Sequence, residues 1–504
     1  MFKIFKGFPL VEAYQELKKA RRLDASKTLG RVIKLSIAII VALALWFMPI
    51  DSFGIAGLTV IEQRLIAIFA FATLMWVLEA VPAWTTSMVV VAILLLSVSD
   101  SSIWFLTEGI PQEQLGQMVK YKSIMHCFAD PIIMLFIGGF ILAIAATKSG
   151  LDVLLARVML KPFGTQSRYV LLGFIVVTGV FSMFLSNTAT AAMMLTFLTP
   201  VLKALPADGK GKIGLALAIP VGANIGGMGT PIGTPPNAIA LKYLNDPEGL
   251  NLNIGFGEWM SFMLPYTIIV LFISWILLLR LFPFKAKTIE LNIEGEAKKD
   301  WRSIVVYITF VITMLLWIFD KFTGVNSNVV AMIPVAVFCV TGIITKRDLE
   351  EISWSVLWMV AGGFALGVAL QETGLAKHLI EAIPFDTWPP ILMIIGSGLI
   401  CYAMANFISH TATAALLVPI LAIAAISMKE NLESFGGVST LLIGVAMASS
   451  VAMILPISTP PNALAHATGM IEQKDMIKVG IIIGAIGLVI GYSMMIVLGS
   501  NGLI

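Results

Sequence analysis

The stretches Ser186-Asn187-Thr188-Ala189-Thr190 and Ser409-His410-Thr411-Ala412-Thr413 decide the fold, because each interrupts an otherwise apolar segment. A second interruption follows each of them, Gly233-Thr234-Pro235-Pro236-Asn237 in the first case and Ser458-Thr459-Pro460-Pro461-Asn462 in the second. Lipid cannot hydrogen-bond the backbone N–H and C=O groups that such breaks release. We therefore predict that the four breaks converge on one another inside the protein.

The composition predicts a polytopic membrane protein. The 504 residues are 58% hydrophobic and only 12% charged, with a mean hydropathy of +0.93, whereas a soluble domain is usually about 25% charged. A net charge of +3 does not indicate nucleic-acid binding. The three cysteines have no paired spacing and are interpreted as packing residues. Because no HExxH motif and no nucleotide-binding glycine loop occurs, neither zinc catalysis nor ATP use is indicated.

The N-terminal segment, residues 1–34, carries nine Lys and Arg residues among apolar ones. This pattern predicts an interfacial helix followed by a basic anchor, rather than a cleaved signal peptide. The positive-inside rule places this end in the cytoplasm. Since residues 498–504 contain no Lys or Arg, an external C-terminus would make the number of crossings odd. Without a targeting segment, a bacterial plasma membrane is the expected location.

Apolar spans alternate with polar connections along the chain. The first spans are expected at 33–50, 62–82 and 84–98, and later ones at 260–283, 303–319 and 326–344. Glu79 is the one acid well inside the second span, and we interpret it as a hydrogen-bonding residue near a helix end rather than a functional one. Two glycine-centred stretches near 130–150 and 352–375 can either span the membrane or dip in and return as re-entrant hairpins. Residues 285–302 are predicted to link two halves.

The second half repeats the first. Gly138-Gly139-Phe140 recurs as Gly362-Gly363-Phe364, and both the serine motif and the proline motif recur in the same order. The offsets are nearly constant: 362 − 138 = 224, 409 − 186 = 223 and 459 − 234 = 225. We therefore expect an internal repeat covering 35–284 and 303–504, a design that transporters with broken helices share. The offsets do not distinguish an inverted repeat from a parallel one.

The residues at the breaks suit an anion. Alanine-rich helical sequence resumes after each serine motif, and a helix N-terminus carries about half a positive charge and free N–H donors. Thr188 and Thr411 can donate hydroxyl hydrogens, and Asn187 can donate amide hydrogens while its carbonyl oxygen faces a cation. Two such ends could bind the two carboxylates of a dicarboxylate. The alternative is that these residues only cap helices, which the duplicated pairing with a proline break makes the weaker explanation.

Oxygen atoms near the first break could also bind a cation. Pro235-Pro236 cannot continue a helix and leave upstream carbonyls unpaired. Ser182 and Ser186 share a helix face if the helix continues to the break, and Asn187 with a carbonyl near Gly233 could complete an oxygen cage for sodium. The alternative is that the serine hydroxyls bond back to their own backbone.

At these motifs the sequence resembles the divalent anion/sodium symporter family, the dicarboxylate carriers that include the INDY proteins. The resemblance runs from about residue 35 to the C-terminus. It implies an all-α homodimer with two inverted repeats, eleven membrane crossings and two re-entrant hairpins. It also implies a transport domain that moves like an elevator against a scaffold, and substrates such as succinate, malate, fumarate or 2-oxoglutarate. The helices would be broken at 186–188, 229–237, 409–411 and 456–462.

The family's functional residues carry over onto the motifs with one departure. The resemblance implies substrate contacts at Asn187, Thr188, Thr411 and Pro460, and a first sodium site at Ser182, Ser186, Asn187 and Gly233. At the second site His410 stands where sodium-coupled members have asparagine, and Ala405 where they tend to have a hydroxyl residue. Both changes remove oxygen ligands. A protonated His410 could contact the substrate directly, and a buried neutral histidine is the alternative.

The charge balance bears on what drives transport. A dianion in the membrane needs compensating charge, and two helix ends supply about one positive charge. Because the four breaks contain no Lys or Arg, the remainder would come from sodium, as in a symporter, or from His410, as in an exchanger. We therefore predict dicarboxylate exchange, with sodium-coupled dicarboxylate or sulfate symport as the alternative. An anion channel is less supported, and no catalytic arrangement or organic cofactor site is found for an enzyme.

Overall fold

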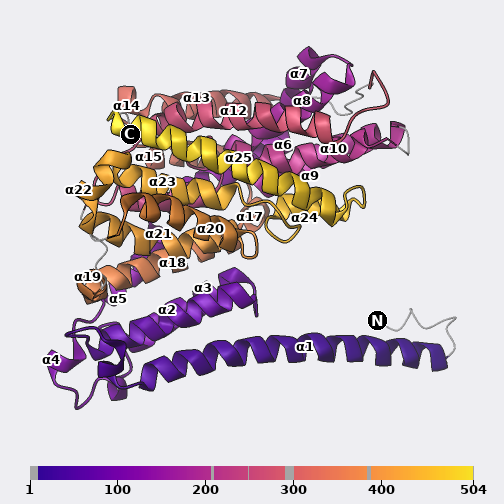
Figure 1. Cartoon of the computed structure of the whole chain (residues 1–504). Coiled ribbons are helices and arrows are strands. Elements are labelled where there is room, and N and C mark those ends of the chain that lie inside the picture. Colours follow the sequence, from indigo (N-terminus) through magenta and orange to yellow (C-terminus); the bar gives the residue numbers. More distant parts are fainter. Residues whose placement is uncertain (1–9, 206–208, 248, 290–299, 383–387, 503–504) are drawn as a thin grey trace.

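The computed structural model describes residues 10–205, 209–247, 249–289, 300–382 and 388–502. These residues fold almost entirely into helices, without strands beyond two isolated bridges, and most of the long helices lie roughly side by side (Figure 1). The predicted all-α fold is confirmed.

Nine helices among these residues are long and apolar enough to cross a membrane, or ten if one bent pair counts as a span. The predicted number, about eleven, is higher. The difference arises because α3 (Ala83–Ser97), α10 (Gly211–Gly227) and α23 (Gly437–Ser450) are too short to meet this criterion alone. Two of these three helices end at breaks, so a crossing there would need a second helix beyond the break.

The N-terminal helix α1 (Leu10–Phe47) is continuous over 38 residues. The basic segment and the first span therefore belong to one helix, in which the stretch apolar enough to cross a membrane is Thr28–Phe47 rather than 33–50. Figure 1 shows α1 lying along α2 (Val60–Leu78) and extending past it. Gln63 of α2 donates to the carbonyls of Leu45, Trp46 and Met48, at distances of 2.6–3.1 Å. These bonds satisfy carbonyls that the end of a helix leaves unpaired.

The corner between α2 and α3 is formed by Glu79. Its backbone has φ +48°, in the left-handed region, and Val81-Pro82 follow before α3 begins. The side chain is exposed. The position of Glu79 at a helix end is confirmed, and its conformation ends α2. The expected hydrogen bond of its side chain is not found among the described residues.

The glycine-centred segments are straight helices. Residues 131–149 form α6 (Pro131–Ser149) and residues 354–373 form α18 (Trp354–Thr373), so the predicted hairpins near 130–150 and 352–375 are wrong. Their glycines allow close packing instead, as small residues do between membrane helices. A Cβ atom on Gly138 would lie 2.3 Å from the Ala331 carbonyl oxygen, and one on Gly363 would lie 2.7 Å from the Ala415 Cβ. Each helix ends at a glycine with positive φ, Gly150 or Gly374.

The chain folds back at the first serine motif. Helix α8 (Ser167–Phe184) runs beside α10 in the same direction, because Gly222 of α10 meets Ile175 and Gly226 meets Gly179. Helix α9 (Asn187–Ala204) starts beside Gly227, at the end of α10, and finishes shortly before α10 begins. It therefore runs in the opposite direction, and α8 and α9 form a hairpin whose tip is Leu185-Ser186.

The second serine motif is also a hairpin tip. Helix α20 (Ser397–Ala405) follows a π-helical turn (Leu392–Gly396) and runs beside α23, where the Cys401 thiol lies 3.4 Å from the Val445 carbonyl oxygen. Helix α21 (His410–Ser427) starts beside Ala452, just after α23, and returns through α22 (Lys429–Leu432) to the start of α23. The tip of this hairpin is 406–409.

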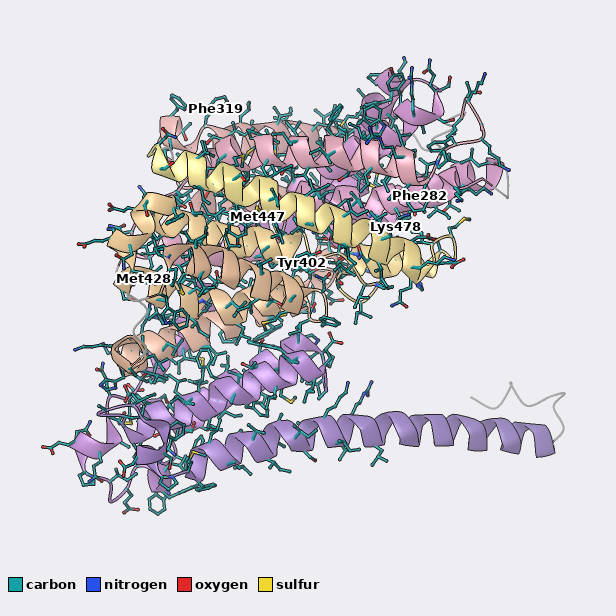
Figure 2. The ribbon with its side chains drawn as sticks, in the orientation of Figure 1. Phe282, Phe319, Tyr402, Met428, Met447 and Lys478 are labelled. Carbon is teal, nitrogen blue, oxygen red and sulfur yellow. The ribbon has the colours of Figure 1, made fainter. Side chains whose placement is uncertain are left out.

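The two halves meet in the middle of the bundle. Helix α11 (Pro235–Leu244) follows the first break and packs on α21 and α23, while α24 (Pro460–Ala467) follows the second break and packs on α9 and α10. Figure 2 shows Phe282, which contacts Gly214 near the start of α10, at one end of the bundle and Met428, just after α21, at the other. The hairpins thus open toward opposite ends, an arrangement consistent with inverted repeats.

The remaining helices complete the bundle around this centre. Of the predicted linker 285–302, residues 290–299 lie outside the described part of the chain. The other α-helices of the described residues are α4 (Gln112–Leu115), α5 (Tyr121–His126), α7 (Leu151–Leu160), α12 (Phe256–Leu281), α13 (Trp301–Ile318), α14 (Asp320–Thr323), α15 (Ser327–Val330), α16 (Met332–Val340), α17 (Lys346–Glu350), α19 (Leu375–Ala382) and α25 (Gln473–Ser500).

Candidate anion and cation site

Each hairpin tip presents a capped helix N-terminus. The Ser186 hydroxyl accepts a hydrogen bond from the backbone N–H of Ala189 (3.3 Å), and the Ser409 hydroxyl accepts one from Ala412 (3.2 Å). Helices α9 and α21 therefore begin at Asn187 and His410, as the sequence predicts. The positive end of a helix dipole lies at each tip.

Oxygen atoms converge beside the first tip. The Ser182 hydroxyl lies 2.6 Å from the Asn187 Oδ1 atom and donates to the Ala223 carbonyl at 2.7 Å. With the Asn187 amide turned over, its nitrogen would lie 3.0 Å from the Gly233 oxygen and 3.2 Å from the Ala223 oxygen. The Asn187 side chain thus ends among three oxygen atoms, one from a hydroxyl and two from backbone carbonyls.

This cluster has a donor set that fits a sodium ion. Hydroxyl, amide and carbonyl oxygens are the ligands that hard cations prefer. With the amide turned over, the Asn187 nitrogen donates hydrogen bonds to these oxygens, so the cluster is satisfied within the protein. A Cβ atom on Gly227 would lie 2.5 Å from Oδ1, so only glycine leaves the space open. The described residues contain no group of His, Cys, Asp and Glu side chains suited to a transition metal.

The structure brings together only part of the predicted sodium site. Ser182, Asn187 and Gly233 meet, whereas the hydrogen bond of Ser186 is the helix cap. The Ala223 carbonyl is a member that sequence reasoning missed, because a backbone oxygen carries no residue-type signal. The sequence offers one signal near Ala223, the glycine-rich run at 226–229, which lies at the end of α10.

The second tip differs because His410 fills it. The Nε2 atom of His410 lies 2.6 Å from the carbonyl oxygen of Ala452, and the residue is only 7% exposed. Ala405, the other departure from the family pattern, is fully buried and offers no side-chain oxygen. The next residue, Asn406, does offer oxygens. Its Oδ1 atom accepts from the backbone N–H of Ile454 (2.8 Å), and its backbone carbonyl accepts from the Ser458 hydroxyl (2.9 Å). Sequence reasoning missed Asn406.

The asparagines of the proline motifs hold the breaks in shape. Asn237 donates from Nδ2 toward the carbonyls of Gly227, Met228 and Thr230 at 2.8–3.3 Å. Asn462 does the same for Met453 (2.9 Å) and Leu455 (3.0 Å). A side-chain amide therefore satisfies carbonyls that the breaks release, which explains why both motifs end in asparagine.

The predicted substrate residues lie at the two tips and at the start of α24. Thr188 is exposed at the first tip, Thr411 is buried at the second, and Pro460 is the exposed first residue of α24. Within the described residues no hydrogen bond joins these three. A cavity of ≈ 490 Å³ reaches the second tip at Ile408-Ser409 from the α2–α3 corner, and Arg31 also lines it. The second tip is therefore accessible from outside the bundle.

The family described as the sodium:sulfate symporter transmembrane region matches residues 29–501. The chain belongs to this family. It is the divalent anion/sodium symporter family that the motifs resemble, and its members are transporters rather than enzymes.

Relatives agree with this assignment, and two solved transporter structures share the fold. An uncharacterised transporter of Haemophilus influenzae is 32% identical, with 84% of this chain and 89% of the relative covered. The sodium-dependent dicarboxylate transporter SdcS of Staphylococcus aureus is 31% identical, with 79% and 84% covered. The Alcanivorax borkumensis YdaH transporter shares the fold at 11% identity, with a TM-score of 0.54 over 86% of this chain and 98% of that one. MtrF of Neisseria gonorrhoeae gives 0.50 at 14% identity, over 83% and 95%.

Proposed function

We propose that this protein exchanges C4 and C5 dicarboxylates, such as succinate, malate, fumarate and 2-oxoglutarate, across the plasma membrane. The observation that carries the proposal is the contrast between the tips: oxygen atoms gather at Asn187, while His410 bonds to Ala452 at the equivalent place. The name of the SdcS relative supports the substrate class.

The two tips would divide the dicarboxylate between them. Asn187 and Thr188 would bind one carboxylate at the start of α9, and Thr411 and Pro460 the other, at the starts of α21 and α24. His410 would supply there a hydrogen bond or a positive charge in place of the second sodium ion of a symporter. Exchange needs no ion gradient, because one dicarboxylate leaves as another enters.

A second candidate is sodium-coupled symport of a dicarboxylate or of sulfate. The oxygen cluster formed by Ser182, Asn187, Ala223 and Gly233 favours it, since sodium bound there would add positive charge beside the anion. An anion channel is the weakest candidate. It would show currents far above carrier turnover and no stimulation by substrate on the opposite side.

The proposal includes an elevator movement. The moving domain would contain the two hairpins, the broken helices α10–α11 and α23–α24, and the cluster between them. The scaffold would contain α1–α3, α6, α13, α16 and α18, hold a homodimer together in the lipid bilayer, and keep the N-terminus in the cytoplasm.

The experiment that tests exchange is uptake of labelled succinate or 2-oxoglutarate into proteoliposomes. Four conditions are compared: sodium equal on both sides or in a gradient, each with and without unlabelled dicarboxylate inside. Exchange predicts that internal dicarboxylate stimulates uptake severalfold, whether or not a sodium gradient is present. Uptake that follows the sodium gradient and ignores internal substrate would establish symport instead.

A further inference from the structure

Asn224 is a buried polar residue that links the two repeats. It lies on α10, is 1% exposed, and its amide nitrogen donates to the hydroxyl of Thr459 (3.3 Å) and to the Oδ1 atom of Asn462 (3.1 Å). The two acceptors belong to the second proline motif, which comes more than 230 positions later in the chain. These bonds join a helix of the first repeat to the second break.

The acceptors of Asn224 shape the start of α24. The Thr459 hydroxyl caps this helix by accepting from the backbone N–H of Asn462 (3.3 Å). Asn462 in turn donates to carbonyls of the second break. The Asn224 amide therefore bonds to Thr459, which caps α24, and to Asn462, which donates to the carbonyls of the second break. Pro460 lies between these two residues in the sequence.

The residue before Asn224 belongs to the cation cluster. The carbonyl oxygen of Ala223 accepts from the Ser182 hydroxyl at 2.7 Å and lies 3.2 Å from the Asn187 amide. Two consecutive residues of α10 thus point to different places, Ala223 to the oxygen cluster and Asn224 to the second break. A small rotation of this turn of α10 would displace both contacts together.

Among the described residues, no equivalent hydrogen bond runs from the second repeat to the first proline motif. At the repeat offset of 225 residues, 224 + 225 = 449, the second repeat has Ser449, and its hydroxyl donates to Ala446 of its own helix (2.8 Å). Asn237, the counterpart of Asn462, accordingly has a buried Oδ1 atom with no partner among the described residues. The first repeat therefore holds the second break, and the second repeat does not hold the first in this way.

Asn224 is also a residue that stability alone does not favour. Its own Oδ1 atom is buried without a partner within the described part of the chain. An unpaired buried carbonyl oxygen costs stability, and departures of this kind from complete hydrogen bonding concentrate at functional sites.

We propose that Asn224 is a positioning residue that couples the cation cluster at Ser182 to the substrate-binding start of α24. The inference rests on the proposed dicarboxylate function. Sodium that orders the Ala223 carbonyl fixes the same turn of α10, and Asn224 then holds Thr459 and Pro460 in the geometry that binds the carboxylate. Because coupling is reciprocal, dicarboxylate also tightens sodium binding by the same factor.

The test measures binding rather than transport. Succinate affinity of purified full-length protein is determined by titration calorimetry in high and in low sodium, for the wild type and three variants. Asn224→Ala removes the amide, Asn224→Asp keeps its shape but replaces the donor with an acceptor, and Ser449→Ala changes the symmetric position. Melting temperature in detergent shows whether each variant is folded.

The wild type should bind succinate more tightly in high sodium. Loss of one neutral hydrogen bond weakens binding by up to roughly tenfold, so Asn224→Ala should weaken succinate binding by about three- to tenfold and reduce the sodium effect by a similar factor. Asn224→Asp should lose at least as much, and Ser449→Ala should match the wild type.

Each contrary outcome identifies what fails. Folded Asn224→Ala and Asn224→Asp proteins with the wild-type sodium effect would overturn the positioning role. A wild type whose succinate affinity ignores sodium would overturn the coupling. If neither Asn224 variant folds, Asn224→Ser provides the folded comparison, because its polar hydroxyl is too short to reach Thr459 and Asn462. An unchanged sodium effect in that variant counts against the role. A wild type that binds no dicarboxylate would overturn the proposed function, and the inference with it.

Discussion

One pair of residues at equivalent positions, Asn187 and His410, distinguishes the two halves of the site. Both are the first residue of a helix that begins at a hairpin tip. The amide of Asn187 ends among oxygen atoms, whereas the imidazole of His410 ends on one carbonyl. Imidazole nitrogen is a poor ligand for sodium, so the second tip lacks the cluster of oxygen donors that the first tip presents.

Replacing His410 with asparagine tests this difference. His410→Asn should raise the half-saturation concentration of succinate transport by about three- to tenfold, because the bond between the imidazole and the Ala452 carbonyl is lost. The measurement is initial uptake into proteoliposomes over a range of succinate concentrations at one fixed pH.

His466→Asn is the matched control, because it makes the same substitution in the last turn of α24. It should leave the half-saturation concentration unchanged. If His410→Asn transports with the wild-type affinity, the role assigned to His410 is wrong.

At the scale of elements, short connections are fixed by charged side chains. Helix α17 begins at a capping box in which the Asp348 carboxylate accepts from the backbone N–H and the hydroxyl of Thr345, both at 2.7 Å. Lys148, at the end of α6, lies 2.6 Å from the same carboxylate. Burial alone would raise the pKa of Asp348, but the hydrogen bonds from Lys148 and Thr345 outweigh it and lower the pKa below its usual range.

This shift has a defined effect on stability. A carboxyl whose pKa is lower in the folded state stabilises the protein above its unfolded pKa of about 4, and the stabilisation is lost as pH falls through the folded pKa. Asp348→Asn should therefore destabilise the protein at pH 7, by about 1 kcal/mol for a partly exposed pair within a capping box. The difference from the wild type should shrink as the pH falls below about 4, toward the lowered pKa of the folded state.

Thermal unfolding in detergent at several pH values measures the Asp348 effect. Glu350→Gln is the control, because Glu350 is exposed on the same short helix. A stability difference for Asp348→Asn that stays constant with pH would show that the carboxylate charge is not what holds α17.

At the scale of the whole molecule, ionic and aromatic contacts join the proposed moving domain to the proposed scaffold. Lys242, near the end of α11, pairs with Asp130 at the start of α6 (2.8 Å) and lies 3.7 Å from the centre of the Phe364 ring on α18. Side chains of these two ionic partners are only 19% and 15% exposed. If α11 moves past α6 during transport, this pair must separate.

Cross-linking this pair tests the elevator. Asp130→Cys and Lys242→Cys are introduced together into a background without Cys127, Cys339 and Cys401, and joined by a short bismaleimide reagent. Complete cross-linking should abolish succinate uptake while succinate binding remains. Each single cysteine variant treated with the same reagent serves as the control. Full uptake by cross-linked protein would exclude movement of α11 against α6.

The sequence by itself determined the features that neighbouring residues produce. Composition predicts the membrane bundle, the constant offsets predict the repeat, and Ser186 and Ser409 predict where helices begin, because a cap acts within one turn. The structure confirms that helices α9 and α21 begin there, at Asn187 and His410.

Only the tertiary structure decided where the chain folds back and which atoms meet. A pair of glycines is compatible with a break in a helix or with close packing of a continuous helix. Here the glycines allow packing, because Ala331 lies against Gly138 and Ala415 lies against Gly363. The carbonyl of Ala223 and the amide of Asn224 acquire their contacts from residues 41 and more than 230 positions away. Backbone oxygens and long-range hydrogen bonds leave no local pattern, so the sequence could name the motifs of the site but not the contacts that join its two halves.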